Sequence, residues 1–220
     1  MSERLITKKI KDIKGFNATD IDFLIPILKA DGSKIGELKP VNKKLIKEVE
    51  IVNSLTKWRE KFTRYFLTQF QPTIQRTVNW LNNVVVASDN KVLFLIYNEN
   101  NKLIGHIGLS NISVDSVEID NLVRGEVGGD KDLIFFSEIA LIDWVFYQLN
   151  VPLIVLNVFS NNFLAINLHK EVGFSIYKEK ELWKYTTGND VFFSTNKGVG
   201  IIAKFKYIGM KLSKNNKENK

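Results

Sequence analysis

The sequence of 220 residues contains no cysteine, only four prolines and only two histidines. Without cysteine the chain has no disulfide, no thiol nucleophile and no zinc–thiolate site. This composition fits a cytoplasmic protein, and we expect that location. No apolar run approaches the roughly 18 residues of a membrane-spanning helix, and no apolar segment follows the basic start MSERLITKKIKDIK. We therefore expect neither a membrane partner nor a secretory signal.

Positive charge is concentrated at the two ends of the chain. The net charge is +7, and residues 1–14 and 211–220 together carry +6 of it. A nucleic-acid-binding domain concentrates basic side chains on its folded surface, so no nucleic-acid partner is expected. We interpret residues 211–220 as a disordered basic tail. Because neither end shows an apolar face, we expect both to be dispensable for catalysis.

The rest of the chain has the size and apolar content of a single domain, with 45% hydrophobic residues. We divide residues 1–210 into an N-terminal extension (1–54), a core (55–177) and C-terminal strands (178–210). Turn residues and apolar periodicity predict about seven strands flanked by helices. Outside the core motifs, we expect strands at 21–28, 34–38, 92–97, 102–110, 190–195 and 201–212, and helices at 43–58 and 73–81.

The most informative segment begins with the alternating, strand-like run Val117–Val123. The turn that follows, residues 124–132, contains three glycines, which let the backbone bend sharply and let a ligand approach its N–H groups. A helix predicted over Leu133–Leu149 points the positive end of its dipole at this turn. A phosphate-binding turn is one interpretation, and a plain connector is the alternative.

A second strand and helix follow directly. Pro152–Phe159 is a short apolar run typical of a strand that is buried on both faces. Asn162 then supplies an N-cap for a helix of about ten residues that ends at Gly173, a residue suited to a C-cap.

This order of strand, glycine turn, helix, strand and asparagine-capped helix resembles the acyl-CoA-binding core of the GNAT acetyltransferase superfamily. The resemblance rests on R-G-E-V-G-G-D-K-D-L (124–133) and N-x-x-A-I-x-L-H-x-x-x-G-F (162–174). It covers residues 55–177, because the region around Trp58, Phe66 and Trp80 resembles the first helices and residues 92–110 the central hairpin. Asp132 departs from the family pattern, in which many members carry glycine before the helix.

The resemblance implies an α/β single domain with a mixed central sheet and a splayed parallel strand pair that binds CoA. The implied activity is transfer of an acetyl or other short acyl group from acyl-CoA to a primary amine, with no metal. The residues expected to hold acyl-CoA are Asn121, Leu122, Val123, Arg124, Gly125, Gly128, Gly129, Asp130, Lys131, Asp132, Leu133, Asn162 and Ala165.

Three side chains are candidates for proton transfer. Glu118 and Asp120 share one face of the first strand, and one of them could act as general base for the acceptor amine. A polar face that meets solvent or lysine is the alternative, and the resemblance favours Glu118. His169 stands where many members carry the tyrosine that protonates the departing thiolate, and histidine can donate a proton near neutral pH. The alternative is that His169 packs on its helix and caps a carbonyl.

The acceptor is less defined than the donor. Trp58, Arg59, Phe70 and His106 are candidates for the acceptor site, although such aromatic residues and histidines are more often structural. The segment 118–125 and the N-terminal extension are most similar to branches that acylate nucleotide-linked amino sugars in surface polysaccharide synthesis. A protein N-terminus, another small amine, and a CoA-binding module without activity are the alternatives, and a homodimer is left open.

Overall fold

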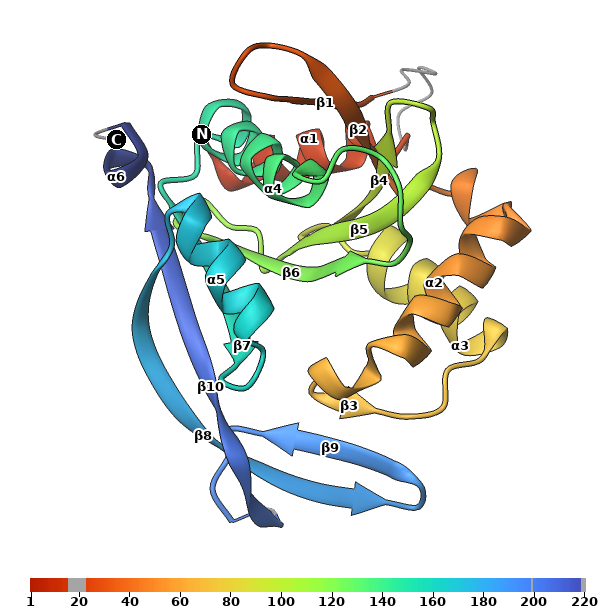
Figure 1. The fold of residues 1–220 in the computed structure, drawn as a ribbon, viewed down its shortest axis with the longest axis vertical. Coiled ribbons are helices and arrows are strands. Elements are labelled where there is room, and N and C mark those ends of the chain that lie inside the picture. Colours follow the sequence, from red (N-terminus) through yellow and green to blue (C-terminus); the bar gives the residue numbers. More distant parts are fainter. Residues whose placement is uncertain (16–22, 199, 219–220) are drawn as a thin grey trace.

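The computed structural model describes residues 1–15, 23–198 and 200–218, which fold around one ten-stranded sheet (Figure 1). The strands are β1 (Ile25–Leu28), β2 (Lys34–Pro40), β3 (Thr68–Gln69), β4 (Val92–Asn98), β5 (Leu103–Ser110), β6 (Val117–Arg124), β7 (Leu153–Phe159), β8 (Ser175–Thr187), β9 (Asp190–Ser194) and β10 (Ile201–Ser213). Their order is β1-β2-β4-β5-β6-β7-β10-β8-β9-β3, and β6–β7 is the one parallel pair in the described sheet. The predicted α/β class is confirmed. The sequence predicted about seven strands, and the described sheet has ten.

Helices cover both faces of the central strands. They are α1 (Glu3–Ile13), α2 (Val49–Lys61), α3 (Ile74–Trp80), α4 (Leu133–Asp143), α5 (Phe163–Val172) and α6 (Lys214–Glu218). Strand β4 shows the two layers, because Phe94 packs in the cluster that contains α1, α4 and α5. Its neighbour Leu93 packs in the cluster that contains α2. None of the helices in the described chain is long and apolar enough to cross a membrane.

The N-terminal segment folds as a docked helix, so the expectation that residues 1–14 lack an apolar face is wrong. Ile6, Ile10 and Ile13 recur at helical spacing in α1 and are buried in the main core. Basic side chains occupy the other faces of the helix. The sequence prediction considered only the charge of this segment and therefore missed the three isoleucines. Part of the N-terminal charge therefore belongs to the folded domain.

The C-terminal region also differs from the prediction. Strands β9 and β10 do not pair with each other, because β8, which was not predicted, lies between them. Leu212 is buried in β10, and α6 follows from Lys214. A disordered tail starting at residue 211 is therefore wrong for 211–218, and residues 219–220 lie outside the described chain.

Most other predicted elements are present with shifted ends. The hairpin strand expected from residue 21 begins at Ile25, and residues 21 and 22 are outside the described chain. The helix expected over 43–58 is interrupted at Glu48, whose backbone is extended (φ −79°, ψ 111°), and α2 follows it. The helix expected over 133–149 consists of α4 and a π-helical turn, Trp144–Leu149, that ends at the left-handed Asn150.

The parallel pair opens partway along its length. Val117–Ile119 of β6 pair with Ile154–Leu156 of β7, and β6 residues after these have no partner on β7. A β-bulge lies at the point of divergence, because His106 faces Val123 and Gly108 faces Asp120 across the β5–β6 ladder. Two β6 residues, Asn121 and Leu122, thus oppose Ile107 alone. Asn121 takes the left-handed conformation with φ 52° that this turn in the strand requires.

Candidate active site

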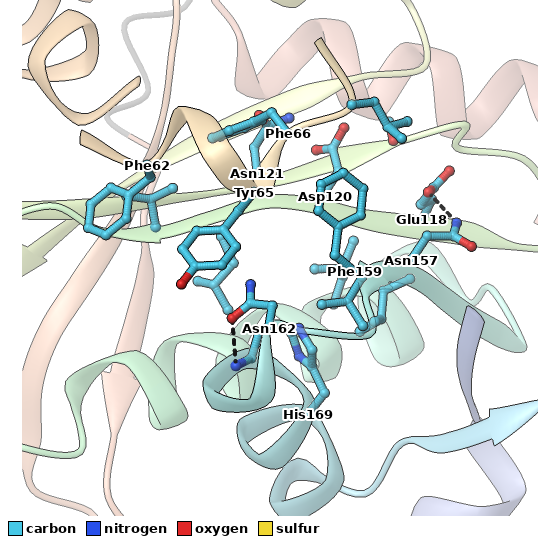
Figure 2. Close-up of a pocket in the computed structure, with 18 of the residues that line it drawn as sticks. Phe62, Tyr65, Phe66, Glu118, Asp120, Asn121, Asn157, Phe159, Asn162 and His169 are labelled. Atoms are coloured by element: carbon cyan, nitrogen blue, oxygen red, sulfur yellow. Dashed lines mark hydrogen bonds between the residues drawn. The ribbon is translucent and has the colours of Figure 1, made fainter. Parts of the chain in front are cut away.

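A cavity of about 750 Å³ lies where β6 and β7 diverge (Figure 2). One wall is formed by β6 and the other by β7, α5 and Tyr207 of β10. The loop that follows α2 closes a third side with the aromatic residues Phe62, Tyr65 and Phe66. The opening of the parallel pair and the cavity are thus the same structural feature.

The structure brings together the predicted catalytic residues and one part of the predicted acyl-CoA site. The predicted residues that line the cavity are Glu118, Asp120, Asn121, Leu122, Val123, Arg124, Asn162, Ala165 and His169. They come from β6 and α5, the two elements that the strongest sequence motifs predicted. The other predicted site residues, in the glycine turn and the acceptor set, are not in the cavity lining.

Trp58 and His106 lie beneath the cavity wall and support it. Trp58 is buried, and its Nε1–H donates to Glu126 Oε1 at 3.0 Å. The indole also stacks on the imidazole of His106, with ring centroids 5.9 Å apart. Both residues therefore support the β6 wall, and neither is in the cavity lining.

His106 holds the bulge of β6. Its Nδ1 lies 2.6 Å from the carbonyl oxygen of Asn121, and a carbonyl can only accept, so Nδ1 carries the proton. Burial lowers the pKa of His106 to about 4, against smaller opposing effects of this hydrogen bond and of Asp120. The ring is therefore neutral at physiological pH and serves as a fixed hydrogen-bond donor.

Arg59 and Phe70 belong to the packing between α2 and the loop before α3. The Arg59 guanidinium donates to the Thr68 carbonyl at 2.5 Å and lies 3.6 Å from the ring centroid of Phe66. Burial lowers the pKa of Arg59 to about 10. Phe70 lies against the same guanidinium and against Arg76. This group fixes the loop that carries the cavity's aromatic residues.

The glycine turn is braced by its own side chains. Arg124 donates to the carbonyls of Gly128 and Lys131 at 3.0 and 3.2 Å. Asp130 accepts the N–H of Asp132 at 2.9 Å, so one amide of the expected anion site is already bonded. The amine of Lys29, next to β1, reaches the same carboxylate at 2.7 Å and holds the pKa of Asp130 below its usual value.

Two of the three glycines in the turn are required by packing. A Cβ on Gly125 would lie 2.0 Å from the indole of Trp58. Gly129 has φ +70°, and a Cβ there would lie 2.8 Å from the Cβ of Asn98. A Cβ on Gly128 meets nothing closer than 3.8 Å, so Gly128 is the glycine that leaves open space at the turn.

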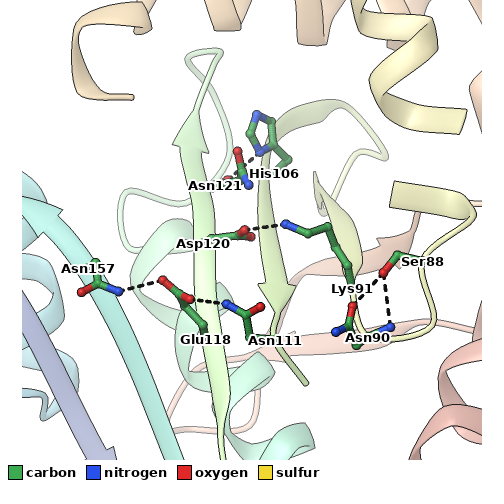
Figure 3. A network of polar contacts seen from close by, with 9 residues as sticks. All are labelled: Ser88, Asn90, Lys91, His106, Asn111, Glu118, Asp120, Asn121 and Asn157. Carbon is green, nitrogen blue, oxygen red and sulfur yellow. Dashed lines mark hydrogen bonds and ion pairs between the residues drawn. The ribbon is translucent and has the colours of Figure 1, made fainter. Parts of the chain in front are cut away.

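Glu118 is held by two amides at the closed end of the cavity. Its Oε1 accepts from Asn157 Nδ2 of β7 at 2.8 Å, and its Oε2 accepts from Asn111 Nδ2 at 2.7 Å (Figure 3). This carboxylate therefore ties β6 to the neighbouring strand where the two are still paired.

Asp120 lies one residue before the bulge. Its Oδ2 accepts from Lys91 Nζ at 2.9 Å, which makes an ion pair between β6 and the residue that precedes β4 (Figure 3). Its Oδ1 is buried and has no hydrogen-bond partner among the described residues. The missing side chain of Gly108 makes room for this oxygen, since a Cβ there would lie 2.2 Å from it.

The two helical candidates lie on α5. Asn162 is the predicted N-cap, and its Oδ1 accepts the N–H of Ala165 at 3.4 Å. His169, two turns further along, lines the cavity, and its Nδ1 lies 2.7 Å from Oε1 of Glu138 on α4. His169 thus meets a carboxylate from another helix, whereas the sequence offered a backbone carbonyl as its structural partner.

Sequence reasoning missed several residues of the cavity. Tyr207, Asn157 and Lys91 line it, together with Tyr65 of the loop. Burial raises the pKa of the Tyr207 phenol, and the charges of Glu118 and Asp120 raise it further. These residues come from distant strands, so no local spacing relates them to β6. Tyr207 directly follows Lys206 in a strand of mixed polar and apolar residues, so the sequence offered no signal for it.

The opened parallel pair and its asparagine-capped helix have the arrangement expected of an acyl-CoA-binding core. A family model described as an acetyltransferase (GNAT) domain matches residues 48–192, more than half of the chain. The chain therefore belongs to the GNAT family and is an acyl-CoA-dependent N-acetyltransferase. Comparison with curated proteins finds no match.

Solved structures show the same fold. A probable GNAT acetyltransferase from Chromobacterium violaceum is similar with a TM-score of 0.66 and 11% identity, covering 91% of each chain. Spermidine N-acetyltransferase from Vibrio cholerae, in complex with CoA and spermine, gives 0.61 and 16%, covering 81% of this chain and 95% of its own. An acetyltransferase from Salmonella typhimurium that modifies the N-terminal serine of ribosomal protein L7/L12 gives 0.59 and 12%, covering 87% and 99%. Identities this low extend the likeness to the fold alone.

Proposed function

We propose that the cavity binds acetyl-CoA between β6 and β7 and transfers its acetyl group to a primary amine. The observation that carries this proposal is the bulge at Asn121, where β6 leaves β7 and opens a cavity of about 750 Å³. Backbone groups of residues 121–123 have no partner on β7, so those that are not bonded on the β5 side, where His106 holds the Asn121 carbonyl, are available to an extended ligand. The predicted acyl-CoA residues of β6 and α5 fit such a ligand.

The chain's own residues have three tasks in this reaction. The bulge and the capped α5 hold the donor, so that the amine meets the thioester at a fixed place. A carboxylate on β6 takes the proton that the amine must lose. Aromatic side chains of the loop after α2 exclude water from the acceptor side. His169, on the opposite wall, is the group that can protonate the departing sulfur.

Two observations support Asp120 as the proton acceptor in preference to Glu118. Asp120 is adjacent to the bulge, whereas Glu118 lies where β6 still pairs with Val155 of β7. Both oxygens of Glu118 also accept hydrogen bonds from amides, which suits a structural role. The sequence favoured Glu118, so the two carboxylates make a matched pair for testing.

The acceptor that we propose is a primary amine on a molecule that also carries an anionic group. Arg64 lines the cavity, its guanidinium lies 4.7 Å from the ring centroid of Tyr65, and it has no acidic partner within the described chain. The lining also contains Arg124 and Lys91, so its three cations outnumber the carboxylates of Glu118 and Asp120, and the cavity is poorly suited to a polycation such as spermidine. A nucleotide-linked amino sugar meets these requirements and remains the leading candidate. An acidic peptide N-terminus is the second candidate.

The test is release of CoA thiol from acetyl-CoA with three classes of amine at equal concentration. We expect turnover with nucleoside-diphosphate-linked amino sugars, less with peptides that have acidic residues near the N-terminus, and least with spermidine. Preferred turnover of spermidine would contradict the proposed acceptor. No thiol release with any primary amine would contradict the proposed function itself. Arg64→Gln is the control, because it should raise KM for the anionic acceptor and leave KM for acetyl-CoA unchanged.

A further inference from the structure

The α4–α5 wall of the cavity contains a carboxylate that the reaction described above does not use. Glu138 lies in the middle of α4, and its side chain is 0% exposed. Its Oε1 is 2.7 Å from Nδ1 of His169, while its Oε2 is buried without a hydrogen-bond partner among the described residues. His169 is therefore the residue in the described chain that compensates this buried group.

The burial of Glu138 limits where the protons of the pair can be. An uncompensated carboxylate in an apolar core is costly, so the pair is expected to be neutral overall. In one neutral arrangement the ring of His169 carries both protons and Glu138 is ionised. In the other, Glu138 holds a proton and donates it to Nδ1. Both arrangements leave a hydrogen on Nε2 of His169.

Nε2 is the ring nitrogen of His169 that Glu138 leaves free. His169 lines the cavity beside Asn162, close to the end of β7 (Figure 2). No residue of the described chain forms a hydrogen bond with Nε2, whereas Nδ1 is engaged by Glu138. The ring of Phe174 packs against the imidazole at 5.9 Å and helps to fix its orientation. The imidazole of this cavity-lining residue thus has one nitrogen anchored in the core and a second nitrogen without a partner in the described chain.

We propose that Glu138 is a positioning residue that keeps Nε2 of His169 protonated and directed at the departing sulfur. This inference rests on the proposed function. The amine nitrogen forms its bond to the acyl carbon, and the carbon–sulfur bond breaks with its electron pair on sulfur. Sulfur takes the proton from Nε2, the amine nitrogen loses its proton to Asp120, and His169 regains a proton from solvent. Glu138 touches no reacting atom and acts through the ring.

The first arm of the test observes the ring directly. The chain has only two histidines, so ¹⁵N-histidine labelling gives two sets of ring signals, which a His106→Gln variant assigns. We expect His169 to show a protonated Nε2 and a strongly hydrogen-bonded proton at Nδ1. Glu138→Gln should shift the His169 signals and leave those of His106 in place. A His169 ring with a bare Nε2, or one that Glu138→Gln does not affect, would overturn the proposal.

The second arm is a double-mutant cycle on kcat. Glu138→Gln should lower kcat about tenfold and leave KM for acetyl-CoA unchanged, because it removes the anchor of the acid. In the His169→Phe background the same substitution should have no further effect on kcat. An equal loss in both backgrounds would show a merely structural role. Asp143→Asn is the control for charge, since Asp143 ends the same helix outside the cavity and pairs with Lys217.

If Glu138→Gln fails to fold, a double variant provides the test instead. Glu138→Leu together with His169→Phe removes both polar partners from an apolar site, so this pair of changes should fold and have the kcat of His169→Phe. A lower kcat than that of His169→Phe in a folded protein would contradict the inference. If the wild-type protein shows the expected ring signals but no turnover with any amine, the proposed function fails and the Glu138–His169 pair stands.

Discussion

The two walls of the cavity each contain a histidine, and the two histidines differ in the group that holds Nδ1. On the β5–β6 wall, Nδ1 of His106 donates to the carbonyl of Asn121 at 2.6 Å. On the α4–α5 wall, Nδ1 of His169 meets the carboxylate of Glu138 at 2.7 Å. The Asn121 carbonyl accepts the single N–H of a neutral His106 ring and holds that ring in place. The buried carboxylate of Glu138 instead favours one more proton, which it shares with His169. The His106–Asn121 contact fixes the bulge of β6, and the Glu138–His169 contact keeps a proton on a side chain that lines the cavity.

The largest effect that we expect from this difference is on stability below neutral pH. Burial lowers the folded-state pKa of His106 to about 4, below the 6.5 of an unfolded chain. The unfolded chain therefore binds more protons, so stability that is complete above pH 6.5 is lost as pH falls toward 4. A shift of this size corresponds to about 3 kcal/mol. Urea unfolding of the wild type between pH 7 and pH 4 measures the loss.

Two variants decide whether His106 is its source. Because a glutamine amide can still donate to the Asn121 carbonyl, His106→Gln should fold and should lack this part of the pH dependence. His169→Gln should retain it. Parallel pH profiles for the wild type and His106→Gln would mean that His106 does not remain neutral in the folded chain, and the contrast between the two walls would be lost.

The next effect concerns the carboxylates of the β6 wall. Asp120→Asn should lower kcat by about 10²-fold at pH 7, since an amine substrate then loses its positioned proton acceptor. The loss should decrease at higher pH, where solvent supplies more free amine. Steady-state thiol release from pH 6 to pH 9 measures both features.

Glu118→Gln is the matched variant, two residues earlier on the same face of β6. A glutamine oxygen can still accept from one of the two asparagine amides, so we expect less than a tenfold loss of kcat. The reverse order, with Glu118→Gln the more damaging change, would place the proton acceptor at the closed end of the cavity. Full activity of both variants would mean that the enzyme acts by positioning alone.

A smaller loss is expected on the opposite wall. His169→Phe should lower kcat about tenfold, because a thiol of pKa near ~8.5 departs readily as thiolate even without an acid. The aromatic ring preserves packing against Phe174, but loss of the imidazole leaves the buried Glu138 without its partner, so we also expect lower stability in urea unfolding. A loss as large as that of Asp120→Asn would make protonation of the sulfur as important as deprotonation of the amine.

The smallest expected effect comes from α6, which pairs with the α4–α5 wall only at the last residue of α4. Ending the chain after Ser213 removes α6, whose Lys217 pairs with Asp143 at the end of α4. Because this ion pair is far along the helix from Glu138, kcat and KM should change less than twofold. A pronounced loss of kcat on truncation would show that the end of α4 is coupled to the α4–α5 wall.

Local patterns predicted the parts of the fold that local chemistry determines. Asn162 and Gly173 marked both ends of α5, and the apolar run of β7 indicated a strand inside the sheet, although one of its two faces is only half-buried. Strand β8 was missed because SIYKEKELWKYTT is mostly charged and polar, and Leu182 is its one fully buried residue. Its position follows from pairing with β9 and β10, which no local pattern reveals.

The candidate site was predictable only where a motif encodes it. The β6 carboxylates and His169 are found from their place in the two motifs, and the structure brings them to one cavity. The bracing of the bulge by His106 depends on which residues the β5–β6 register makes neighbours. Glu138 is 31 positions away from His169 and occupies an apolar helix, so its pairing with the imidazole depends on how α4 packs on α5.

The central claim is that the donor lies in the opening between β6 and β7, and amide-resolved NMR of the protein titrated with CoA tests it most directly. We predict the largest shifts at the N–H groups of residues 121–123 and at the start of α5, around Asn162 and Ala165. The amides of 117–119, which pair with β7, should move little. Shifts confined to β8 and β9 or to the outer face of α2, with residues 121–123 unchanged, would contradict the account.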